Sequence, residues 1–469
     1  MSRFAPALAA LLLAGCVAGP APEIATPAPE LPASFLYQPA ASEEAALANL
    51  LPRSDSAFAA LSDAALAQSP TLLEALARID FARAGADRAG AQRLPSVGLG
   101  GSAQVSRTNP DQFGSSLPPG AGFDTARAQY GANVSASWDP DVFGRLRAEE
   151  RAARTRVDAA DADAAAVRLA LTAEIAAAVI DLRTLAARRN AIASDAADAR
   201  ELARLAGVRE RAGIAPGFDR VRAETSLAAS TSRLEALASE RARLVGRLVT
   251  LTAQPAGAVE QALASPEPSW ELPPAPATLP SALLANRPDI RAASARLAAS
   301  DHDLAATAAR RFPRFDLSAT IGLVAFGLGG LFDTDFIVGS PAGAIAAPLL
   351  DVGRIAAEID GAAAEKRAAF QRYRGAVYQA LGDAETAYAL VAAADREAAA
   401  AGEEASLASR QSQLAETRYR AGLSDFLTVL DARRGADGSR ERAAAALGRA
   451  HRVRVLLWQA LGGHSDGTG

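Results

Sequence analysis

The sequence predicts a membrane protein of the α+β class, in which strands of several chains close a β-barrel that continues into a barrel of long helices. Three observations support this fold class: the sequence is internally duplicated, each copy contains a helix of extreme length, and each copy contains two runs of alternating polarity. Four strands per protomer and three protomers give a 12-stranded transmembrane β-barrel, and the same symmetry gives twelve helical segments around one axis.

The internal duplication is visible as aligned prolines and glycines. Four pairs align the copies: Pro70 with Pro288, Pro95 with Pro313, Gly144 with Gly353, and Gly213 with Gly422. The first two pairs are 218 residues apart and the last two are 209 apart, so the second copy is nine residues shorter between its strands and its long helix. Each copy therefore carries the same order of elements: a helix, two strands, a long helix, a tight turn and a returning helix.

The duplication also sets the expected domain boundaries. We predict a first repeat at residues 62–252 and a second at residues 281–463, joined by a Pro-rich linker at 253–280. The stretch ASPEPSWELPPAPATLP within this linker has too many prolines for a helix or a central strand. Residues 16–61 are expected to form an N-terminal extension, and 464–469 a flexible tail.

The long helices are predicted from proline spacing and apolar periodicity. No proline occurs between Pro140 and Pro216, or anywhere after Pro348. From Gly144 to Gly213 there are 69 residue steps, as in the equivalent segment of the second copy, and at 1.5 Å per residue this gives about 100 Å. Apolar residues at steps of three and four predict coiled packing: Val157, Ala160, Ala164, Val167, Leu171, Ile175, Ala178, Leu182 and Leu185, then Phe370, Tyr373, Val377, Leu381, Ala384, Tyr388 and Val391.

The strand-like runs alternate apolar and polar residues, as a barrel wall between lipid and water requires. Residues 127–138 place Ala128, Tyr130, Ala132, Val134, Ala136 and Trp138 on one face. Runs near 97–105 and 314–323 alternate in the same way, and a less regular fourth run covers 336–348. Four strands cannot close a barrel, and an open edge in hydrocarbon would leave backbone groups unpaired. We therefore expect three chains to share one barrel, with the loops at 108–125 and 327–335 facing outward.

The N-terminus has the features of an exported lipoprotein. Arg3 precedes an apolar run that is too short to span a membrane, and small residues then lead to Cys16, the chain's single cysteine. Residues 1–15 are thus predicted to be a signal peptide. The segment Leu13–Cys16 resembles a bacterial lipobox, which implies a covalent lipid on Cys16, and Val17 in place of Asp implies sorting to the outer membrane.

Composition argues against several other classes of function. The net charge of −4, with both signs interspersed, does not indicate a nucleic-acid partner. His302, His451 and His464 lack the spacing of metal ligands. The Gly-Leu-Gly runs at 98–100 and 327–329 lack the third glycine of a dinucleotide fingerprint. We therefore expect neither an enzyme nor a cofactor beyond the lipid.

Taken together, these features resemble the TolC-like outer-membrane efflux family, in its lipoprotein branch that serves RND-type multidrug pumps. The resemblance rests on the lipobox, the duplicated halves, and the motifs NRPDI, PLLDVG and RYRAGLSDFLTVLDAR. It implies a homotrimeric channel, lipid-anchored in the outer membrane, whose helical barrel crosses the periplasm. A periplasmic adaptor (membrane fusion protein) and an inner-membrane transporter are the implied partners of an exit duct for drugs or other small toxic compounds.

The resemblance also implies a gate at the periplasmic tip, where the turns RAGI and RAGL lie. By motif position, Asp431 corresponds to an acidic ring position, and Asp219 and Tyr419 correspond to residues that tie the tip shut. Two positions depart from the family pattern: Thr428 replaces the other ring acid, and Ser424 replaces a basic tie residue. The closed state is then expected to depend more on Asp219 and Tyr419, with Leu427.

Three alternative functions remain open from the sequence. Two are channels, for one-step protein secretion or for metal efflux. The third is a periplasmic coiled-coil adaptor lipoprotein, which would have one helical hairpin and no paired strands. The alternative interpretation of Asp431 is a solvent-facing residue near a helix N-terminus, where its negative charge interacts favourably with the helix dipole.

Overall fold

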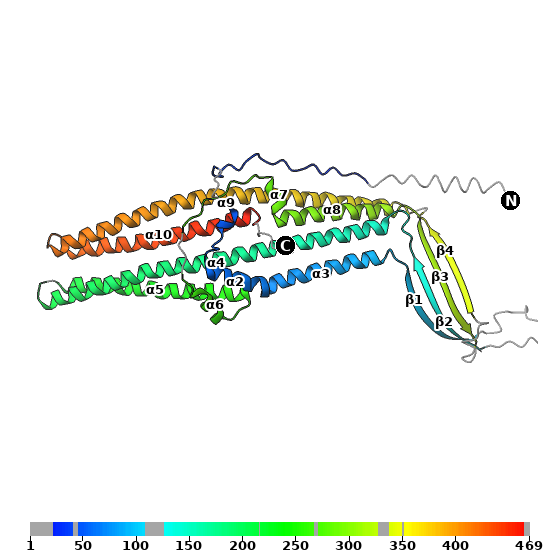
Figure 1. The fold of residues 1–469 in the computed structure, drawn as a ribbon, viewed down its shortest axis with the longest axis horizontal. Coiled ribbons are helices and arrows are strands. Elements are labelled where there is room, and N and C mark those ends of the chain that lie inside the picture. Colours follow the sequence, from blue (N-terminus) through cyan, green and yellow to red (C-terminus); the bar gives the residue numbers. More distant parts are fainter. Residues whose placement is uncertain are drawn as a thin grey trace, which may run out of the picture. The chain divides into compact units, whose positions relative to one another are not determined.

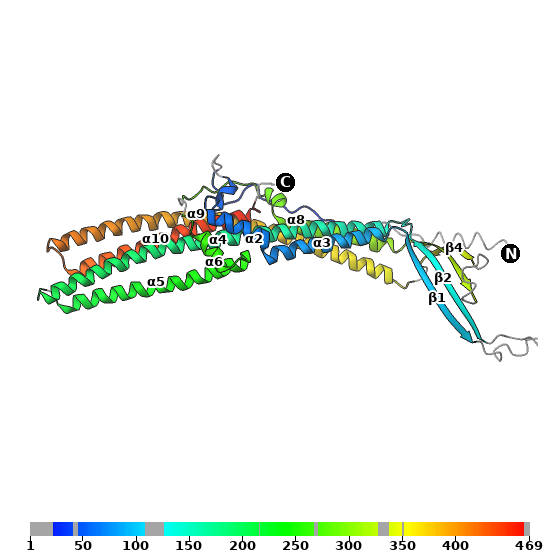
Figure 2. The same ribbon diagram turned by 60° about the horizontal axis from the view of Figure 1, so that its bottom comes forward.

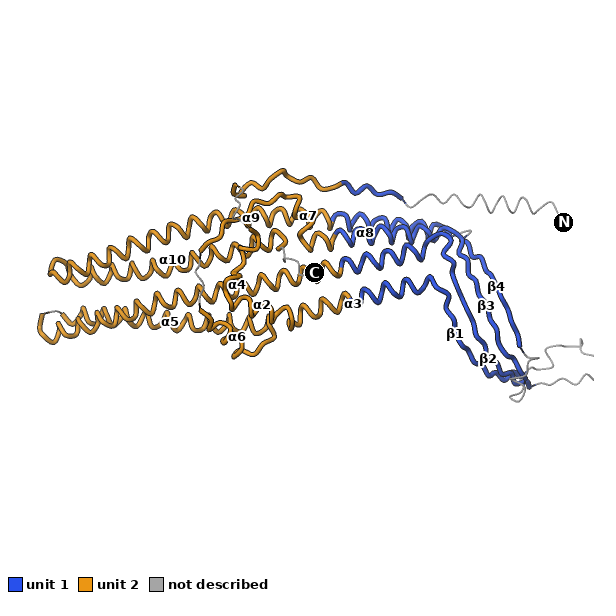
Figure 3. Tube along the Cα trace, in the orientation of Figure 1, with its two compact units in different colours: residues 1–27, 80–159, 294–371 blue, residues 28–79, 160–293, 372–469 orange. Residues whose placement is uncertain are grey.

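The computed structural model describes residues 22–40, 46–107, 126–214, 216–266, 271–326, 337–348 and 351–463. The chain divides into two compact units (Figure 3). Unit 1 comprises residues 1–27, 80–159 and 294–371, and unit 2 comprises residues 28–79, 160–293 and 372–469.

Unit 1 contains one antiparallel sheet of four strands in the order β1-β2-β3-β4 (Figure 1). The strands are β1 (Ser96–Arg107), β2 (Ala126–Trp138), β3 (Arg314–Ala325) and β4 (Ile337–Ala346). The pairing of β2 with β3 joins the two sequence repeats, from Tyr130 opposite Ala325 to Trp138 opposite Leu317. All four predicted strands are thus confirmed, and β1 and β4 form the two edges of this sheet.

Asn133 of β2 sits between two glycines of the neighbouring strands. It lies opposite Gly100 of β1 and Gly322 of β3. A Cβ at Gly100 would meet the Asn133 side-chain oxygen at 2.8 Å, and one at Gly322 would meet the carbonyl oxygen of Ala132 at 2.6 Å. The sheet therefore needs glycine at position 322, where a side chain would meet backbone, whereas a side chain at position 100 would meet the end of the asparagine side chain.

The paired helices of the two repeats have equal lengths. The first helices, α3 (Pro70–Ala91) and α8 (Pro288–Ala309), each have 22 residues. The long helices, α4 (Arg145–Arg211) and α9 (Arg354–Arg420), each have 67 residues and belong to both units. This confirms the duplication and the two long helices predicted from the glycine and proline positions.

In unit 2, the long helices are paired with returning helices. α5 (Gly217–Thr252) runs back along α4, and α10 (Phe426–Ala460) runs back along α9, as both views show (Figures 1 and 2). Most residues of the predicted apolar stripes are buried, whereas Val157, Ala160, Val167, Tyr373 and Leu381 are only half-buried. The main core of unit 2 includes Ile175 and Ile180 of α4, Leu248 of α5, Tyr388 of α9 and Leu457 of α10.

Shorter helices complete unit 2, and the sequence analysis did not predict them. They are the 3-10 helix η1 (Leu47–Leu50), α2 (Ser56–Gln68), α6 (Ala256–Leu263) and α7 (Ala282–Asn286). Helix α6 lies within residues 253–280, so this segment is not a linker throughout. Pro255 stands at its N-cap, and the eight residues that follow contain no proline. The Pro-rich stretch after α6 contains no helix in its described part, residues 264–266 and 271–280.

None of the described helices is long and apolar enough to cross a membrane.

Candidate functional site

The turns between the long and returning helices in unit 2 share one backbone geometry. After α4, Gly213 has a φ of 72° and the Ile214 amide donates to the Arg209 carbonyl at 3.0 Å. After α9, Gly422 has a φ of 71° and the Leu423 amide donates to the Arg418 carbonyl at 2.8 Å. These are Schellman motifs, in which a left-handed glycine ends the helix and its last carbonyls are satisfied. The repeated RAG sequence is therefore a repeated helix stop.

The second turn leads into α10 through a side-chain cap. The Asp425 carboxylate accepts hydrogen bonds from the Thr428 amide at 2.8 Å and from the Thr428 hydroxyl at 2.6 Å. These bonds favour the ionised carboxylate and hold the pKa of Asp425 below its usual range. The hydroxyl of Thr428, at the position of a ring acid, is therefore engaged in helix capping. Ser424, at the other departing position, donates to the Ala415 carbonyl at 3.5 Å.

Tyr419 of α9 contacts the other hairpin through Arg209 of α4. The Arg209 guanidinium donates to the Tyr419 hydroxyl, and its central carbon lies 5.0 Å from the centre of the tyrosine ring. The Tyr419 ring also packs edge-on against Phe426, with 6.1 Å between ring centres. Around them lies a small apolar cluster: Leu202, Ala206, Ala223, Phe426 and Leu430.

Three of the sequence-predicted gate residues lie on one exposed face of α10. Leu427, Thr428 and Asp431 are all exposed, and Leu427 retains 40% of its accessible surface. Asp219 lies in the first turn of α5 and is half-buried. Neither the Asp431 nor the Asp219 carboxylate forms a hydrogen bond or ion pair with another described residue. Within one protomer, Tyr419 thus bonds Arg209, and no hydrogen bond joins it to Asp219 in the described chain.

Cys16 and the two loops that were expected to face outward, residues 108–125 and 327–335, lie outside the described residues.

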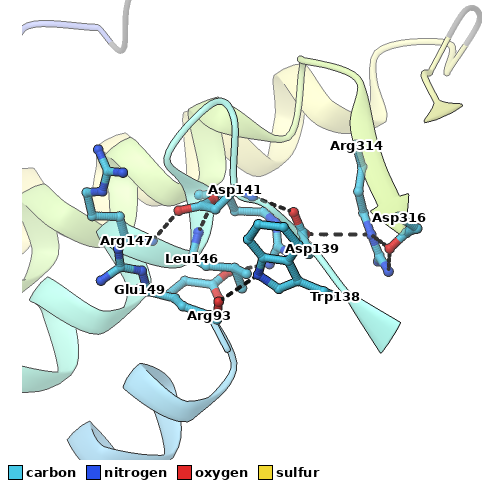
Figure 4. Close-up of polar contacts among 10 residues, drawn as sticks. Arg93, Trp138, Asp139, Asp141, Leu146, Arg147, Glu149, Arg314 and Asp316 are labelled. Atoms are coloured by element: carbon cyan, nitrogen blue, oxygen red, sulfur yellow. Dashed lines mark hydrogen bonds and ion pairs between the residues drawn. The ribbon is translucent and has the colours of Figure 1, made fainter. Parts of the chain in front are cut away.

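At the strand–helix junctions of unit 1, aspartates fix the start of each long helix, and Figure 4 shows the first of these junctions. Asp141, held at a φ of 51°, accepts hydrogen bonds from the Leu146 and Arg147 amides, both at 2.8 Å. In the second repeat, Asp351 accepts from the Gly353 amide at 3.2 Å and from the Ile355 amide at 2.9 Å. The bonds from Leu146, Arg147 and Ile355 satisfy amides of the first helical turn, so each strand passes into its helix through a capped turn.

Further polar contacts join the strand ends to the helices at the first junction. The Trp138 indole donates to the Arg93 carbonyl at 3.0 Å, and Arg145 pairs with Asp139 at 3.0 Å (Figure 4). Arg314, at the start of β3, approaches Asp139 at 3.8 Å. The ends of β2 and β3 are thus connected to each other and to α4 by a network of partly exposed charges.

The described residues contain no group of three or more His, Cys, Asp or Glu side chains that could hold a metal ion.

The fold and the paired turns agree with the comparison of the sequence with known families. The profile of the family described as "Outer membrane efflux protein" matches residues 61–254 and 279–463, which is more than half of the chain. The chain belongs to this family.

Curated relatives cover most of the chain. The pyoverdine export outer membrane protein OpmQ of Pseudomonas aeruginosa is 29% identical over 401 residues, which cover 85% of this chain and 83% of that protein. Outer membrane protein OprJ of the same species is 29% identical over 430 residues, covering 88% and 85%. The solvent efflux pump outer membrane protein SrpC of Pseudomonas putida is 27% identical over 478 residues, covering 98% and 97%.

Solved structures show the same fold. The outer-membrane channel OprN superposes with a TM-score of 0.83 at 27% identity, covering 95% of this chain and 99% of that one. The outer membrane protein VceC of Vibrio cholerae superposes with a TM-score of 0.77 at 27% identity, covering 87% and 97%. These three relatives and two solved structures are outer-membrane proteins by name, and OpmQ and SrpC are named for export and efflux.

Proposed function

We propose that three copies of this chain form the exit duct of a tripartite efflux system, which exports drugs or other small toxic compounds across the periplasm and outer membrane. The observation that supports this most is the four-stranded sheet with two unpaired edges, β1 and β4. Its strands have 10 to 13 residues, and about 9 to 11 suffice to cross a bilayer.

The unpaired edges support a trimer on energetic grounds. In hydrocarbon, each unpaired backbone group costs several kcal/mol, so a spanning sheet must be closed. Pairing β4 of one protomer with β1 of the next would close a barrel of twelve strands. The side chains of β1 and β4 are exposed in the single chain. This agrees with the arrangement, because the free edges would pair with neighbouring protomers and one face of the sheet would contact lipid.

In this trimer, the turns of unit 2 would form the gate. Threefold symmetry would bring three Asp431 carboxylates, and the nearby Leu427 and Thr428, around one axis. A ring of carboxylates attracts cations and binds divalent ions, and its self-repulsion makes closure costly unless other contacts offset it. Arg209 and Tyr419 supply such a contact within each protomer, and we assign Asp219 to the contacts between protomers.

The partners and anchor follow from the same proposal. A periplasmic adaptor and an inner-membrane transporter would deliver the compound to the gate, and a lipid on Cys16 would add to outer-membrane anchoring. Among the alternatives, the curated relatives named for pyoverdine export and solvent efflux favour small molecules over protein secretion. Two hairpins and a paired sheet argue against an adaptor, which would have one hairpin and no such sheet.

The test is the conductance of the purified, full-length protein in planar bilayers, with its mass determined in parallel by native mass spectrometry. The expected result is a trimer with a small, cation-preferring conductance that divalent ions block from the gate side. A folded trimer that never inserts would refute the membrane-spanning barrel, and a monomer would refute the shared one.

A further inference from the structure

We propose that Asp195 and Asp437 form a proton-binding site between the two helical hairpins of unit 2, and that losing this proton at higher pH loosens the hairpins. The proton site stands on the burial of the two carboxyl groups and on the charges around them. Its consequence, a gate that opens more readily as the pH rises, rests on the proposed function.

The two carboxyl groups meet in a buried place. Asp195 lies on α4 of the first hairpin and Asp437 on α10 of the second, and each residue retains only 5% of its accessible surface. Their helices are joined on both sides of this level, by Arg188 with Glu441 at 2.9 Å and by Arg433 with Asp198 at 3.8 Å, which brings the two carboxyl groups together. Two buried carboxylates repel each other when both are ionised, and one proton between them removes this repulsion. The arrangement therefore favours one proton shared by two helices.

The surroundings hold Asp195 firmly in place. Ser230 of α5 donates its hydroxyl to Asp195 at 2.6 Å, and Arg233 of α5 donates at 2.7 Å. Arg233 also approaches Glu441 of α10 at 3.6 Å, so its charge is divided between two carboxylates. The charge that offsets Asp195 is thus incomplete, which favours a proton on the pair.

Other charged groups near Asp437 come from three helices. Arg440 of α10 forms an ion pair with Asp437 and favours its ionised form, whereas Asp198 of α4 opposes it. The remaining neighbours are already paired: Arg188 with Glu441, and Arg433 and Arg442 with Glu416 and Glu404 of α9. These pairs leave Asp437 with one direct cation.

Burial and the neighbouring charges together determine the pH range in which the pair loses its proton. Burial, followed by the contact with Asp195, raises the pKa of Asp437 to about 7. Because this pKa is raised above that of a separated, solvated carboxyl, the stabilisation from the shared proton is complete at acid pH. It is lost as the pH rises through about 7, where two buried negative charges come to face each other.

This pair differs from the other charged contacts between α4 and α10. Arg188 pairs with Glu441, Arg433 approaches Asp198 at 3.8 Å, and Arg452 pairs with Asp181. Each of these contacts joins opposite charges. The Asp195–Asp437 pair instead joins two carboxyl groups. Their interaction is attractive when they share a proton and repulsive when both are ionised.

The proton itself is measured by infrared spectroscopy of the purified full-length protein during a pH titration. The expected signal is a protonated-carboxyl band that disappears with a midpoint near neutral pH. Asp437→Asn, which keeps shape and hydrogen bonding, should remove this band, and Asp195→Asn should shift its midpoint to lower pH. The matched control Asp198→Asn should retain it. The proposal is wrong if the wild type shows no band that titrates near neutral pH. It is also wrong if the band persists in Asp437→Asn.

The loosening is measured by amide hydrogen exchange across α4 and α10, corrected for the intrinsic pH dependence. Below the midpoint, between the pKa of a separated carboxyl and about 7, linkage predicts that local opening increases about tenfold per pH unit in the wild type, and above about 7 it levels off. Asp437→Asn should show no such increase. If the amides of α4 and α10 in the wild type are equally protected at pH 6 and pH 8, the proposed loosening of the hairpins is wrong. Neither measurement requires conduction, so a protein that passes both but conducts no ions would refute the channel and leave the proton site intact.

Discussion

Arg183 of α4 and Asp55, the N-cap of α2, form a buried ion pair with two parallel hydrogen bonds of 2.9 and 3.1 Å. Their side chains retain 7% and 1% of their accessible surface. The guanidinium also donates to the Leu263 carbonyl and the Ser265 hydroxyl, both at 3.2 Å. One arginine therefore joins the first long helix to the N-terminal extension and to the end of α6.

Removing this arginine should strongly destabilise unit 2. We expect Arg183→Met to cost about 3 to 5 kcal/mol, because it leaves the Asp55 carboxylate buried without a cation. Urea unfolding followed by circular dichroism measures the loss. Arg78→Met, in the exposed pair with Glu74, is the control and should cost less than about 1 kcal/mol. Adding Asp55→Asn to Arg183→Met should recover part of the loss, since Asn still caps α2; no recovery would contradict the buried-charge explanation.

Close approach of α4 and α10 should make Gly448 intolerant of a side chain. A Cβ at this position would meet the Thr184 hydroxyl at 2.1 Å. We expect Gly448→Ala to lower the unfolding free energy by about 1 to 3 kcal/mol through overpacking. Gly435→Ala, on the same helix with open space around it, should instead raise stability by up to about 1 kcal/mol. Equal effects of the two substitutions would mean that the helices do not pack this closely.

The contact of Arg209 with Tyr419 should favour the closed gate. Arg209→Gln removes both the donated hydrogen bond and the cation above the ring, so we expect a higher open probability in planar bilayers. Tyr419→Phe keeps the ring and should have a smaller effect, consistent with about 1 kcal/mol for each interaction. The control is Arg204→Gln, whose exposed side chain pairs with Glu201 on its own helix. If Arg209→Gln has the same open probability as this control, the contact between Arg209 and Tyr419 does not stabilise the closed gate.

Asp431 should determine how the channel responds to cations. In Asp431→Ala, we expect weaker cation selectivity and a divalent block weakened by at least about tenfold, because the pore would lose three charges. The exposed carboxylate of Glu403 on α9 offers a control substitution, Glu403→Ala, that should leave both properties unchanged. Unchanged block in Asp431→Ala would remove this residue from the pore and support a solvent-facing role.

Cys16→Ser should separate anchoring from assembly. We expect this variant to form trimers but to be released more easily from outer-membrane fractions by washing, because the lipid adds apolar surface that is buried in the bilayer. Mass spectrometry of the wild type would report the lipid directly. Retention equal to that of the wild type would show that the barrel alone anchors the protein, and loss of trimer would show that the lipid contributes to assembly.

The elements that the sequence predicts best are those with long, regular patterns. The absence of proline after Pro348 and the alternation in residues 127–138 report on backbone structure alone, and α9 and β2 follow from them closely. The glycines at 213 and 422 predict the turns for the same reason, since a left-handed residue is a local requirement. Helix α6 escaped prediction because eight residues between Pro-rich stretches carry too little periodic signal.

Contacts between distant residues required the structure. Tyr419 and Arg209 are 210 residues apart, and no local pattern indicates that they meet. The family resemblance placed Asp219 among the residues that tie the tip shut, and within the described part of a single protomer its carboxylate forms no hydrogen bond or ion pair. Asp437 stands between small residues in a helix, and only the packing of α10 on α4 shows that another carboxyl faces it. Side-chain partners depend on the register in which two helices pack, and local sequence patterns do not predict this register.

The two Schellman turns determine which substitutions this protein can tolerate as its sequence evolves. Their shape rests on backbone hydrogen bonds and on one glycine each, and most neighbouring side chains take no part in it. Residues at positions such as Ser424 can therefore be exchanged without unfolding the turn. Variation at this end of the helices can therefore alter the surface that the turns present, while the scaffold that carries it stays the same.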